Sequence, residues 1–358
     1  MPSRQHPDAV LEATLRALVR ATLGAEVTGC EPIAGQIGLR RFWRVRLAPR
    51  PGAPATLVAR IEAAEDPASR PSGTAPEPAL EPLRHLLETH ALPVPARFGG
   101  DAAAGIELLE DAGERSLAAA VASASGEMRR ALYGEVCALV PRLQRITGPV
   151  AGIAAFERHL GAEQIAYKAT RFIEWSLPER GRPASAAEAQ VVRAAFDVVA
   201  QAVQRAPQRL AHRDLQSSNV HVREGAAPGA RVLLLDLQGA WLAPPEYDLV
   251  CLLRDSYVEL PEPEVDAHLD RVRPELPDTP SAEAFAQRFD LLTLARKGKD
   301  HALFHFIART RGDARYLRFA PTTVRALRRA ATRAAARDTR LNALAELIAE
   351  LPEAPCER

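Results

Sequence analysis

Lysine and asparagine are scarce in this chain of 358 residues. The only lysines are Lys168, Lys297 and Lys299, so nearly all of the 46 basic residues are arginines. The only asparagines are Asn219 and Asn342. An asparagine at a position where a particular chemistry needs one is therefore more informative here than in an average sequence.

The chain also lacks paired cysteines, an excess of one charge and a long apolar run. Its four cysteines include no C-x-x-C pair, so neither a disulfide framework nor a zinc site is indicated. Basic and acidic residues balance at 46 to 45, which gives no general reason to expect a nucleic acid or a membrane as partner. No apolar run is long enough to span a membrane, and Asp8 and Glu12 interrupt the place of a signal peptide. We therefore expect a cytoplasmic globular protein and a monomer.

The first third of the chain mixes helical and strand-like patterns. Apolar residues between 7 and 23 repeat with a helical period. Short strand-like runs separated by glycine and proline follow between residues 31 and 61, and two more lie between 94 and 109. A helix is expected over Leu80–Thr89, between these two groups. Such a pattern indicates a small antiparallel sheet with accompanying helices.

Helical patterns dominate the rest of the chain. The exception is Arg231–Leu237, a short apolar run that is typical of a buried strand. We expect an α+β fold with two lobes, an N-terminal sheet lobe over residues 1–113 and a larger helical lobe over residues 114–358. The cleft between two such lobes is the expected place for a ligand.

One short segment carries the strongest chemical signal, His212-Arg213-Asp214-Leu215-Gln216-Ser217-Ser218-Asn219. Asp236 follows 17 residues after Asn219, at the end of the apolar run. Phosphoryl transfer needs a carboxylate that accepts the proton of the attacking hydroxyl, and oxygen ligands that hold Mg²⁺ on the nucleotide phosphates. Asp214 suits the first role, and Asn219 with Asp236 suits the second. Aspartate and asparagine are also common in turns, but this segment matches every fixed position of the kinase catalytic-loop pattern.

Further segments resemble the same family of proteins as this loop does. They are AGQIGLRRFWRVRL (34–47), LLEDAGERSL (108–117), RFIEW (171–175), LDLQGAWLAPPEYDLVCLLRDSY (235–257) and RGDARYL with Pro321 (311–321). Together they resemble the aminoglycoside phosphotransferase and choline-kinase superfamily, which has a bilobal protein-kinase-like fold. Within it the chain is most similar to bacterial anomeric kinases of N-acetylmuramate and N-acetylglucosamine, used in cell-wall sugar recycling. The resemblance implies ATP and Mg²⁺ as cofactors and a sugar as the substrate.

The residues after Asp236 argue against a protein kinase. About ten residues separate Asp236 from the next helix, and no APE-type element follows, so no activation segment has room to dock a peptide. Asp248 lies where that helix opens, and we expect it to be structural, as a cap or as a brace for the catalytic loop. His212 is expected to be structural as well.

Two places in the N-terminal lobe are candidates for nucleotide binding. Gly35 and Gly38 lie between strand-like runs, where backbone N–H groups of a loop can face phosphates, although relatives carry a more polar turn there. Glu110 and Ala112 lie at the hinge position, where backbone groups would meet the adenine edge. Side-chain identity matters little for such contacts, so the sequence does not decide between ATP and GTP.

Arg60 stands where a kinase-like lobe usually carries a phosphate-binding lysine. An arginine can pair with phosphate oxygens through its planar fork. The alternative is a solvated charge at a strand end. Either Glu77 or Glu81 could brace Arg60, and the sequence does not choose between them.

Four residues are candidates for substrate binding. Glu174 and Trp175 suit a sugar, because an aromatic ring stacks on its apolar face and a carboxylate accepts its hydroxyl hydrogens. An amphipathic helix with a core tryptophan and a surface glutamate explains the pair equally well. Arg296 and Lys299 lie where the relatives carry basic residues, and they could meet the carboxylate of N-acetylmuramate.

Two basic patterns in the last third receive structural interpretations. His301 and His305 are too few for a metal site and are expected to be packing or surface residues. Residues 309–340 hold ten arginines, which we interpret as a solvated helical face rather than a nucleic-acid site.

The sequence therefore predicts an ATP- and Mg²⁺-dependent kinase of a sugar hydroxyl, specifically the anomeric hydroxyl of an N-acetylated amino sugar. The alternative within enzymes is a kinase of aminoglycosides or other small alcohols, but the polycationic aminoglycosides need an acidic pocket. The alternative of another class is a non-catalytic nucleotide-binding regulator. It draws on the altered Gly35–Gly38 loop, the missing lysine and Gly239, where relatives often carry an acidic residue.

Overall fold

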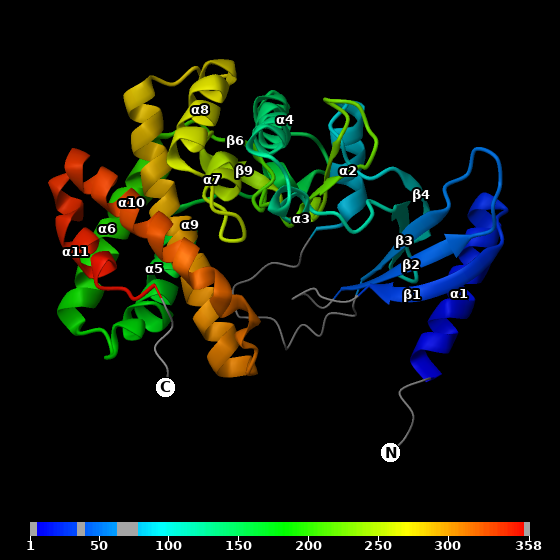
Figure 1. Cartoon of the computed structure of the whole chain (residues 1–358), viewed down its shortest axis with the longest axis horizontal. Helices are drawn as coiled ribbons and strands as arrows, with labels where there is room; N and C mark the ends of the chain where they lie inside the picture. Colours follow the sequence, from blue (N-terminus) through cyan, green and yellow to red (C-terminus); the bar gives the residue numbers. More distant parts are fainter. Residues whose placement is uncertain (1–5, 34–39, 63–77, 354–358) are drawn as a thin grey trace. The chain divides into compact units, whose positions relative to one another are not determined.

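The computed structural model describes residues 6–33, 40–62 and 78–353, and the chain divides into two units (Figure 1). Unit 1 comprises the described residues of Met1–Glu77 and Val94–Glu114, and unit 2 comprises those of Pro78–Pro93 and Arg115–Arg358. The predicted boundary after residue 113 lies next to this division. Residues 78–93 differ from the prediction, because they group with the helical unit.

Unit 1 is a five-stranded antiparallel sheet with one helix packed on it. Its elements are α1 (His6–Leu23), β1 (Val27–Ile33), β2 (Arg41–Leu47), β3 (Thr56–Ile61), β4 (Arg97–Asp101) and β5 (Ile106–Glu110). The strand order is β1-β2-β3-β5-β4. The N-terminal sheet that the sequence predicts is therefore present.

Alternation along β2 shows why the sheet has one buried face. Trp43 and Val45 are buried, whereas Arg44 between them is not, because successive side chains of a strand point to opposite faces. Leu15 and Val19, four residues apart on α1, belong to the same buried cluster. The helix thus covers the apolar face of the sheet.

Unit 2 is mostly helical. Its helices are α2 (Leu80–Thr89), α3 (Leu117–Ala122), α4 (Gly126–Gln144), α5 (Ala162–Trp175), α6 (Ala186–Arg205), α7 (Tyr247–Leu253), α8 (Glu262–Val272), α9 (Ala282–Arg311), α10 (Ala320–Arg337) and α11 (Asn342–Ala349). The sheet in unit 1 and the helices here confirm the predicted α+β class. In the part of the chain that the structure describes, no helix is both long and apolar enough to cross a membrane.

Helix α9 lies at the centre of unit 2. It is 30 residues long and packs against α5, α6, α7 and α10. Because it has neighbours on several sides, even charged residues such as Arg296, Lys297 and Asp300 are buried on it. Buried charges are costly unless they are paired, so the partners of these three residues are informative.

Two short antiparallel ladders lie between the helices. In one, β6 (Arg209–Ala211) pairs with β9 (Trp241–Ala243); in the other, β7 (Val220–Val222) pairs with β8 (Val232–Leu234). Only β8 falls within a strand that the sequence predicts. The other three were missed because three residues are too few to show a period of two.

Helix α2 belongs to unit 2 because its apolar face is buried there. Leu80, Leu83 and Leu87 are buried, and α2 contacts the short 3₁₀ helix Leu237–Gly239. The backbone N–H of Leu234 in β8 also donates to the carbonyl of Pro93 at 2.8 Å.

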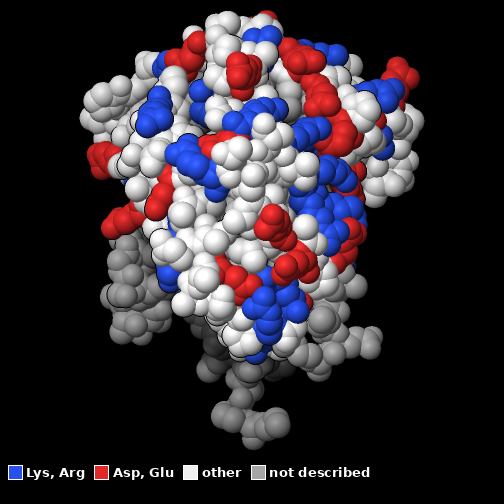
Figure 2. Space-filling model, turned by 90° about the vertical axis from the view of Figure 1, so that its left-hand side faces the viewer, with Lys and Arg blue, Asp and Glu red and all other residues white. Residues whose placement is uncertain are grey.

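The arginine-rich segment forms ion pairs with acidic residues of the same unit. Arg325 and Arg329 pair with Glu259, and Arg329 and Arg333 pair with Glu262. Positive and negative side chains accordingly lie side by side over one face of the molecule (Figure 2). The face that the sequence predicts to be solvated therefore consists of ion pairs. They connect α10 to Glu259 before α8 and to Glu262 within α8.

Candidate active site

The predicted catalytic loop, residues 212–219, joins β6 to β7. In the ladder of β7 with β8, Val220 pairs with Leu234, and the backbone N–H of Leu235 donates to the carbonyl of Asn219 at 2.8 Å. Asp236 follows directly. The β7–β8 ladder thus brings the end of the loop next to the residues that follow β8, although Asp236 comes 17 residues after Asn219 in the sequence.

Asp214 is the acidic residue of this loop and lies beside an arginine. Its Oδ1 accepts a hydrogen bond from Arg296 at 2.7 Å, whereas Oδ2 accepts none from any residue that the structure describes. The side chain is 32% exposed. Burial opposes ionisation, but the positive charges of Arg296 and Lys299 outweigh it and hold the pKa of Asp214 well below its usual value. The carboxylate is therefore ionised at neutral pH, with one oxygen open.

Two residues of the site have left-handed backbone. Arg213 has φ 77° and Asp236 has φ 60°, a region that side chains other than glycine rarely adopt. The Arg213 guanidinium lies 4.7 Å from the centroid of the Trp241 ring and 3.4 Å from the carbonyl of Gly239. Such strain persists where the surroundings fix the conformation, and it is concentrated at functional sites.

Asn219 and Asp236 present oxygen atoms at this place. The Asn219 amide nitrogen donates to the backbone carbonyl of Asp214 at 2.9 Å, which directs the amide oxygen elsewhere. Asp236 is exposed, and its Oδ1 accepts a hydrogen bond from the Gln238 amide. An amide oxygen and a carboxylate are ligands that Mg²⁺ accepts. No group of three or more His, Cys, Asp or Glu side chains suited to a metal occurs within residues 6–33, 40–62 and 78–353.

Asp248 holds the start of the loop. Its two carboxylate oxygens accept the backbone N–H groups of His212 at 2.7 Å and of Arg213 at 3.0 Å. His212 itself is buried, and its ring nitrogens have no hydrogen-bond partner among the described residues. Burial raises the pKa of Asp248, against the lowering by His212 and the two N–H groups. The contacts make Asp248 a brace of the loop backbone.

A second brace, Asp255, was missed in the sequence. It accepts hydrogen bonds from the backbone N–H of Ser217 at 2.8 Å, from the Ser217 hydroxyl, and from the N–H of Tyr257 at 3.1 Å. The one sequence feature that could have marked Asp255 is its position, directly after Arg254 at the end of the apolar helix Tyr247–Leu253. The partner lies 38 residues earlier, which no local pattern reveals.

A cluster of charges on α9 faces the loop. Asp300 accepts from Arg296 Nε at 3.2 Å and from Lys297 Nζ at 2.7 Å, and Lys299 Nζ lies 3.6 Å from it. Burial opposes ionisation of Asp300, but these three cations together hold its pKa well below the usual value. Lys299 is 33% exposed, whereas Arg296 is 4% exposed.

Lys168 on α5 is a further buried cation near this cluster. Its Nζ lies 3.3 Å from the Tyr247 hydroxyl and 5.3 Å from the centroid of that ring. Burial, followed by the positive charges of Arg296 and Lys299, lowers the pKa of Lys168 to about 7. No motif or spacing in the sequence marked this lysine.

Arg60 in unit 1 is buried in β3, at 4% exposure, and it pairs with Glu62. Its burial excludes the alternative of a solvated strand-end charge. Of the two braces considered in the sequence, Glu81 pairs with Arg84 on its own helix, and Glu77 lies outside the described residues. The sequence did not predict the pairing with Glu62, which lies two residues after Arg60.

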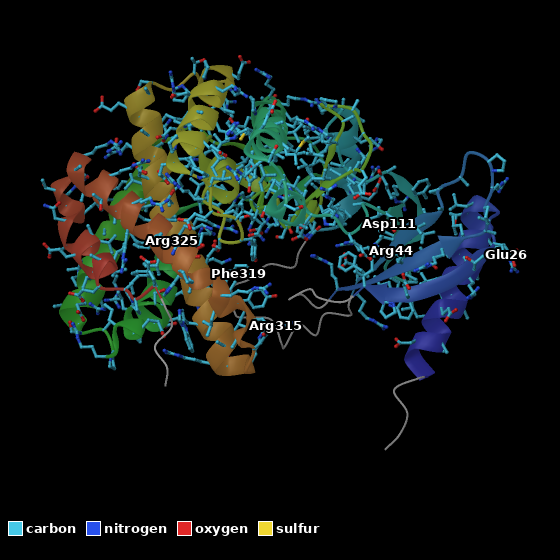
Figure 3. All side chains as sticks on the ribbon, viewed as in Figure 1. Glu26, Arg44, Asp111, Arg315, Phe319 and Arg325 are labelled. Carbon is cyan, nitrogen blue, oxygen red and sulfur yellow. The ribbon has the colours of Figure 1, made fainter. Side chains whose placement is uncertain are left out.

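The predicted hinge is held by an ion pair. Asp111 accepts from Arg44 Nε at 2.7 Å and from the N–H of Gly113 at 2.9 Å, and Arg44 and Asp111 point toward one another in Figure 3. Glu110 accepts the N–H of Ala96 through its carboxylate at 3.1 Å. Ala112 makes no backbone hydrogen bond to any residue for which the structure gives a position.

Gly35 and Gly38, the predicted phosphate loop, lie outside the described residues.

The four substrate candidates fall into two places. Arg296 and Lys299 lie at the catalytic loop. Trp175 packs edge-on against Phe306, and Glu174 is exposed and pairs with Arg171 at 3.2 Å. Phe306 lies about 15 Å along α9 from Arg296, at 1.5 Å per residue. The amphipathic-helix alternative describes the contacts of Glu174 and Trp175, and a substrate role for them stays a prediction.

His301 and His305 are buried and packed together, with ring centroids 4.5 Å apart. His301 Nδ1 lies 2.9 Å from the Ser176 hydroxyl, and His305 pairs with Glu179 at 3.3 Å. Burial lowers the pKa of His301 well below its usual value. Both histidines are therefore packing residues in the interior of unit 2.

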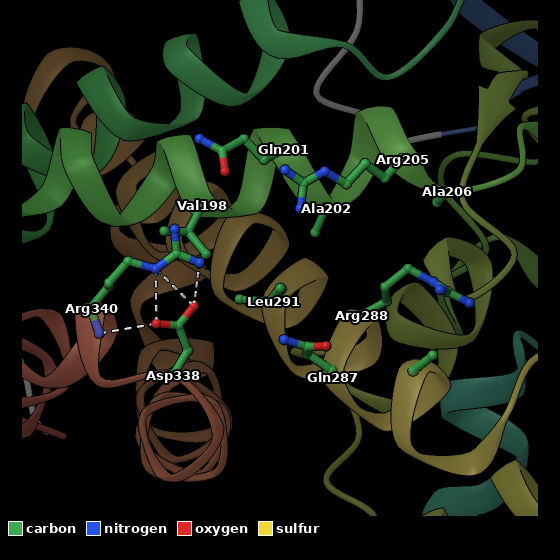
Figure 4. Close-up of a pocket in the computed structure, with 11 residues that line it drawn as sticks. Val198, Gln201, Ala202, Arg205, Ala206, Gln287, Arg288, Leu291, Asp338 and Arg340 are labelled. Carbon is green, nitrogen blue, oxygen red and sulfur yellow. Dashed lines mark hydrogen bonds and ion pairs between the residues drawn. The ribbon is translucent and has the colours of Figure 1, made fainter.

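A pocket of about 180 Å³ lies elsewhere in unit 2, between α6 and α9 (Figure 4). It contains none of the predicted site residues. Two of its arginines are already paired, Arg288 with Glu246 and Arg340 with Asp338.

Comparisons with known proteins indicate the family of this chain. A sequence profile described as "Phosphotransferase enzyme family" matches residues 29–285, more than half of the chain. The N-acetylmuramate/N-acetylglucosamine kinase of Pseudomonas aeruginosa is 34% identical over 162 residues. That match covers 44% of this chain and 45% of the kinase, so the chain aligns with less than half the length of this relative.

Solved structures resemble the whole chain in fold. The choline kinase LicA from Streptococcus pneumoniae has a TM-score of 0.58 at 15% identity, and the match covers 93% of this chain and all of the kinase. The ADP-bound aminoglycoside phosphotransferase APH(2'')-Ib has a TM-score of 0.55 at 13% identity and covers 95% of this chain and 99% of its own. The predicted kinase-like fold is thereby confirmed. The chain belongs to the phosphotransferase enzyme family.

Proposed function

We propose that this enzyme is an ATP- and Mg²⁺-dependent sugar kinase that phosphorylates the anomeric hydroxyl of N-acetylmuramate or N-acetylglucosamine, as in cell-wall sugar recycling. The observation that carries the proposal is the half-buried Asp214 with Oδ2 open. Asn219 donates to its backbone carbonyl, and Asp236 follows Leu235, whose N–H donates to Asn219.

Asp214 is the catalytic base in this proposal. The acceptor hydroxyl donates its hydrogen to Oδ2, and its oxygen forms a bond to the γ-phosphorus of ATP as the bond from that phosphorus to the β-γ bridging oxygen breaks. The proton passes to Asp214, and ADP leaves. The lowered pKa makes Asp214 a weak base, which suits a loose transition state in which the hydroxyl loses its proton late. Orientation of the hydroxyl is then its main contribution.

Asn219 and Asp236 are the proposed ligands of Mg²⁺. The fit rests on the donor atoms: the Asn219 nitrogen is used within the loop, which leaves its oxygen for a cation, and Asp236 adds an exposed carboxylate. When bound, Mg²⁺ offsets negative charge on the nucleotide phosphates.

Unit 1 supplies the proposed nucleotide contacts. Arg60 is a permanently charged donor that can pair with phosphate oxygens. The backbone of Ala112, which has no partner among the described residues, is available for the adenine edge. Gly35 and Gly38 remain proposed phosphate contacts, through their backbone N–H groups.

An acidic acceptor suits the charges at the loop. Arg213, Arg296 and Lys299 all lower the pKa of Asp214, so three cations lie near this carboxylate. A carboxylate-bearing sugar is attracted to such a site, whereas a polycationic aminoglycoside is repelled. The similarity to the Pseudomonas aeruginosa kinase supports the same class of acceptor.

The test is release of ADP from ATP, or of GDP from GTP, by the purified protein with MgCl₂. The acceptor panel contains N-acetylmuramate, N-acetylglucosamine, glucosamine, neutral hexoses, choline and two aminoglycosides. The product is then treated with mild acid. Mild acid hydrolyses a phosphate on the anomeric carbon, as it hydrolyses an acetal, but leaves a phosphate ester of a primary hydroxyl intact.

Turnover of an N-acetylated sugar to an acid-labile phosphate supports the proposal. Turnover confined to choline or an aminoglycoside replaces it with the other acceptor. Nucleotide binding without turnover on any acceptor supports the non-catalytic regulator instead.

A further inference from the structure

Arg296 contacts the catalytic loop at three points. NH1 donates to Asp214 Oδ1 at 2.7 Å and to the carbonyl of Arg213 at 3.1 Å, and NH2 donates to Gln216 Oε1 at 3.3 Å. Its remaining nitrogen, Nε, donates to Asp300 on the same helix at 3.2 Å. The guanidinium therefore ties the loop to α9.

Few donors of Arg296 remain for a substrate. A guanidinium has five N–H groups, and the contacts above use four of them. The Tyr247 hydroxyl also interacts with this side chain. At most one N–H group of Arg296 is therefore left for the acceptor carboxylate that the sequence suggested for it.

Asp300 gives Arg296 a permanent counter-ion. It is buried and remains charged, because Arg296, Lys297 and Lys299 surround it. Breaking the only ion pair of a buried charge is costly. With Asp300 in place, Arg296 keeps a partner when Asp214 takes up the hydroxyl proton during turnover.

We propose that Arg296 is a positioning residue for Asp214, a proposal that rests on the function proposed above. Arg296 holds Oδ1 and directs Oδ2 toward the acceptor hydroxyl, and Asp300 holds Arg296 in that orientation. The planar fork matters as much as the charge, because it bonds the Asp214 carboxylate and the loop backbone at once.

Of the two α9 cations that the sequence suggested for an anionic acceptor, Lys299 is then the one left for this role. It lies on the same helix, is one-third exposed, and keeps a long flexible side chain. The two neighbouring cations thus separate into a positioning role and a binding role, and kinetics distinguish these roles.

The experiment compares Arg296→Gln, Arg296→Lys and Lys299→Gln with the wild-type enzyme. Each is assayed for kcat and KM with N-acetylmuramate, which is anionic, and N-acetylglucosamine, which is neutral. Arg288→Gln is the matched control. It removes another α9 arginine that pairs with a buried carboxylate, Glu246, about 12 Å before Arg296 along the helix.

Positioning predicts that Arg296→Gln lowers kcat on both sugars by the same factor, at least ~100-fold, with each KM changed less than ~3-fold. Arg296→Lys, which keeps the charge but not the fork, recovers part of kcat. Lys299→Gln raises KM for the anionic sugar alone. Arg288→Gln leaves kcat within a factor of ~2, because loss of stability alone does not lower turnover of the folded enzyme.

An increase in KM for N-acetylmuramate alone in Arg296→Gln would overturn the proposal, and so would an unchanged kcat. If Arg296→Gln does not fold, Arg296→Lys decides, because a kcat equal to that of the wild type also contradicts positioning.

The function proposed above fails separately, when the wild-type enzyme turns over neither sugar. Positioning is then tested on whichever acceptor the panel identifies. If the panel identifies none, amide hydrogen exchange of residues 212–219 decides: faster exchange in Arg296→Gln than in Arg288→Gln supports positioning, and equal exchange contradicts it.

Discussion

The side-chain amide of Asn219 donates a hydrogen bond to the backbone carbonyl of Asp214, with 2.9 Å between nitrogen and oxygen. This bond determines which end of the amide is used within the loop. The nitrogen cannot bind a cation, and it is the nitrogen that faces the carbonyl, so the oxygen is the end left for a metal. The residue proposed as catalytic base and a residue proposed as metal ligand are therefore positioned by one contact.

Replacement of Asn219 by alanine should weaken the dependence on magnesium. Asn219→Ala removes one proposed ligand and leaves Asp236, so we expect the Mg²⁺ concentration for half-maximal activity to rise about 10–100-fold. Titration of MgCl₂ at saturating ATP measures it. The control is Asn342→Ala, which changes the only other asparagine, an exposed residue at the start of α11. Equal Mg²⁺ requirements in the two variants would exclude Asn219 as a ligand.

Replacement of Asp248 by alanine should destabilise the fold. Two backbone N–H groups, of His212 and Arg213, would lose their acceptor in a buried place. We expect the free energy of unfolding to fall by about 2–5 kcal/mol. Urea unfolding measures it, with Asp270→Ala, an exposed aspartate of α8, expected to change the value by less than ~0.5 kcal/mol. A loss as small as that of Asp270→Ala would show that Asp248 does not brace the loop.

Lys168 should make stability depend on pH. Its pKa is lowered to about 7 in the folded protein from 10.5, by burial first and then by Arg296 and Lys299. Asp300 and Cys251, which also face it, act in the opposite direction. Between pH 7 and about 10 the unfolded chain binds a proton at this lysine that the folded protein does not. Stability from this group therefore rises with pH, by up to about 1.4 kcal/mol per unit.

The comparison of wild type with Lys168→Met isolates this effect. Urea unfolding at pH 7 and pH 9 should show a wild-type free energy that gains at least ~1 kcal/mol relative to the variant. A difference that does not change with pH would mean that Lys168 titrates normally in the folded protein.

The catalytic loop could be predicted because its chemistry is local. Asp214 and Asn219 lie five residues apart, and the short run before Asp236 is apolar enough to indicate a strand. The same holds for the sheet of unit 1, where β2 alternates buried and outward side chains around Trp43. Patterns with a short period are visible in one sequence.

The surroundings of the loop could not be predicted because they depend on distant contacts. Arg296 reaches Asp214 across 82 residues, and Asp255 reaches Ser217 across 38. The sequence identified Arg296 as a basic residue at the site, but only the packing of α9 decides that it faces the carboxylate of Asp214. For Arg60, likewise, burial and the pairing with Glu62 depend on how β3 packs within its sheet.

The most direct test of the account is the activity of Asp214→Asn. This change keeps the size of the side chain and one acceptor oxygen but removes the charge that accepts the hydroxyl proton. With ATP, MgCl₂ and the best sugar of the panel, we predict that kcat falls at least ~1000-fold while the KM for ATP stays within ~3-fold of the wild type. Wild-type turnover in Asp214→Asn would contradict the assignment of Asp214 as the catalytic base.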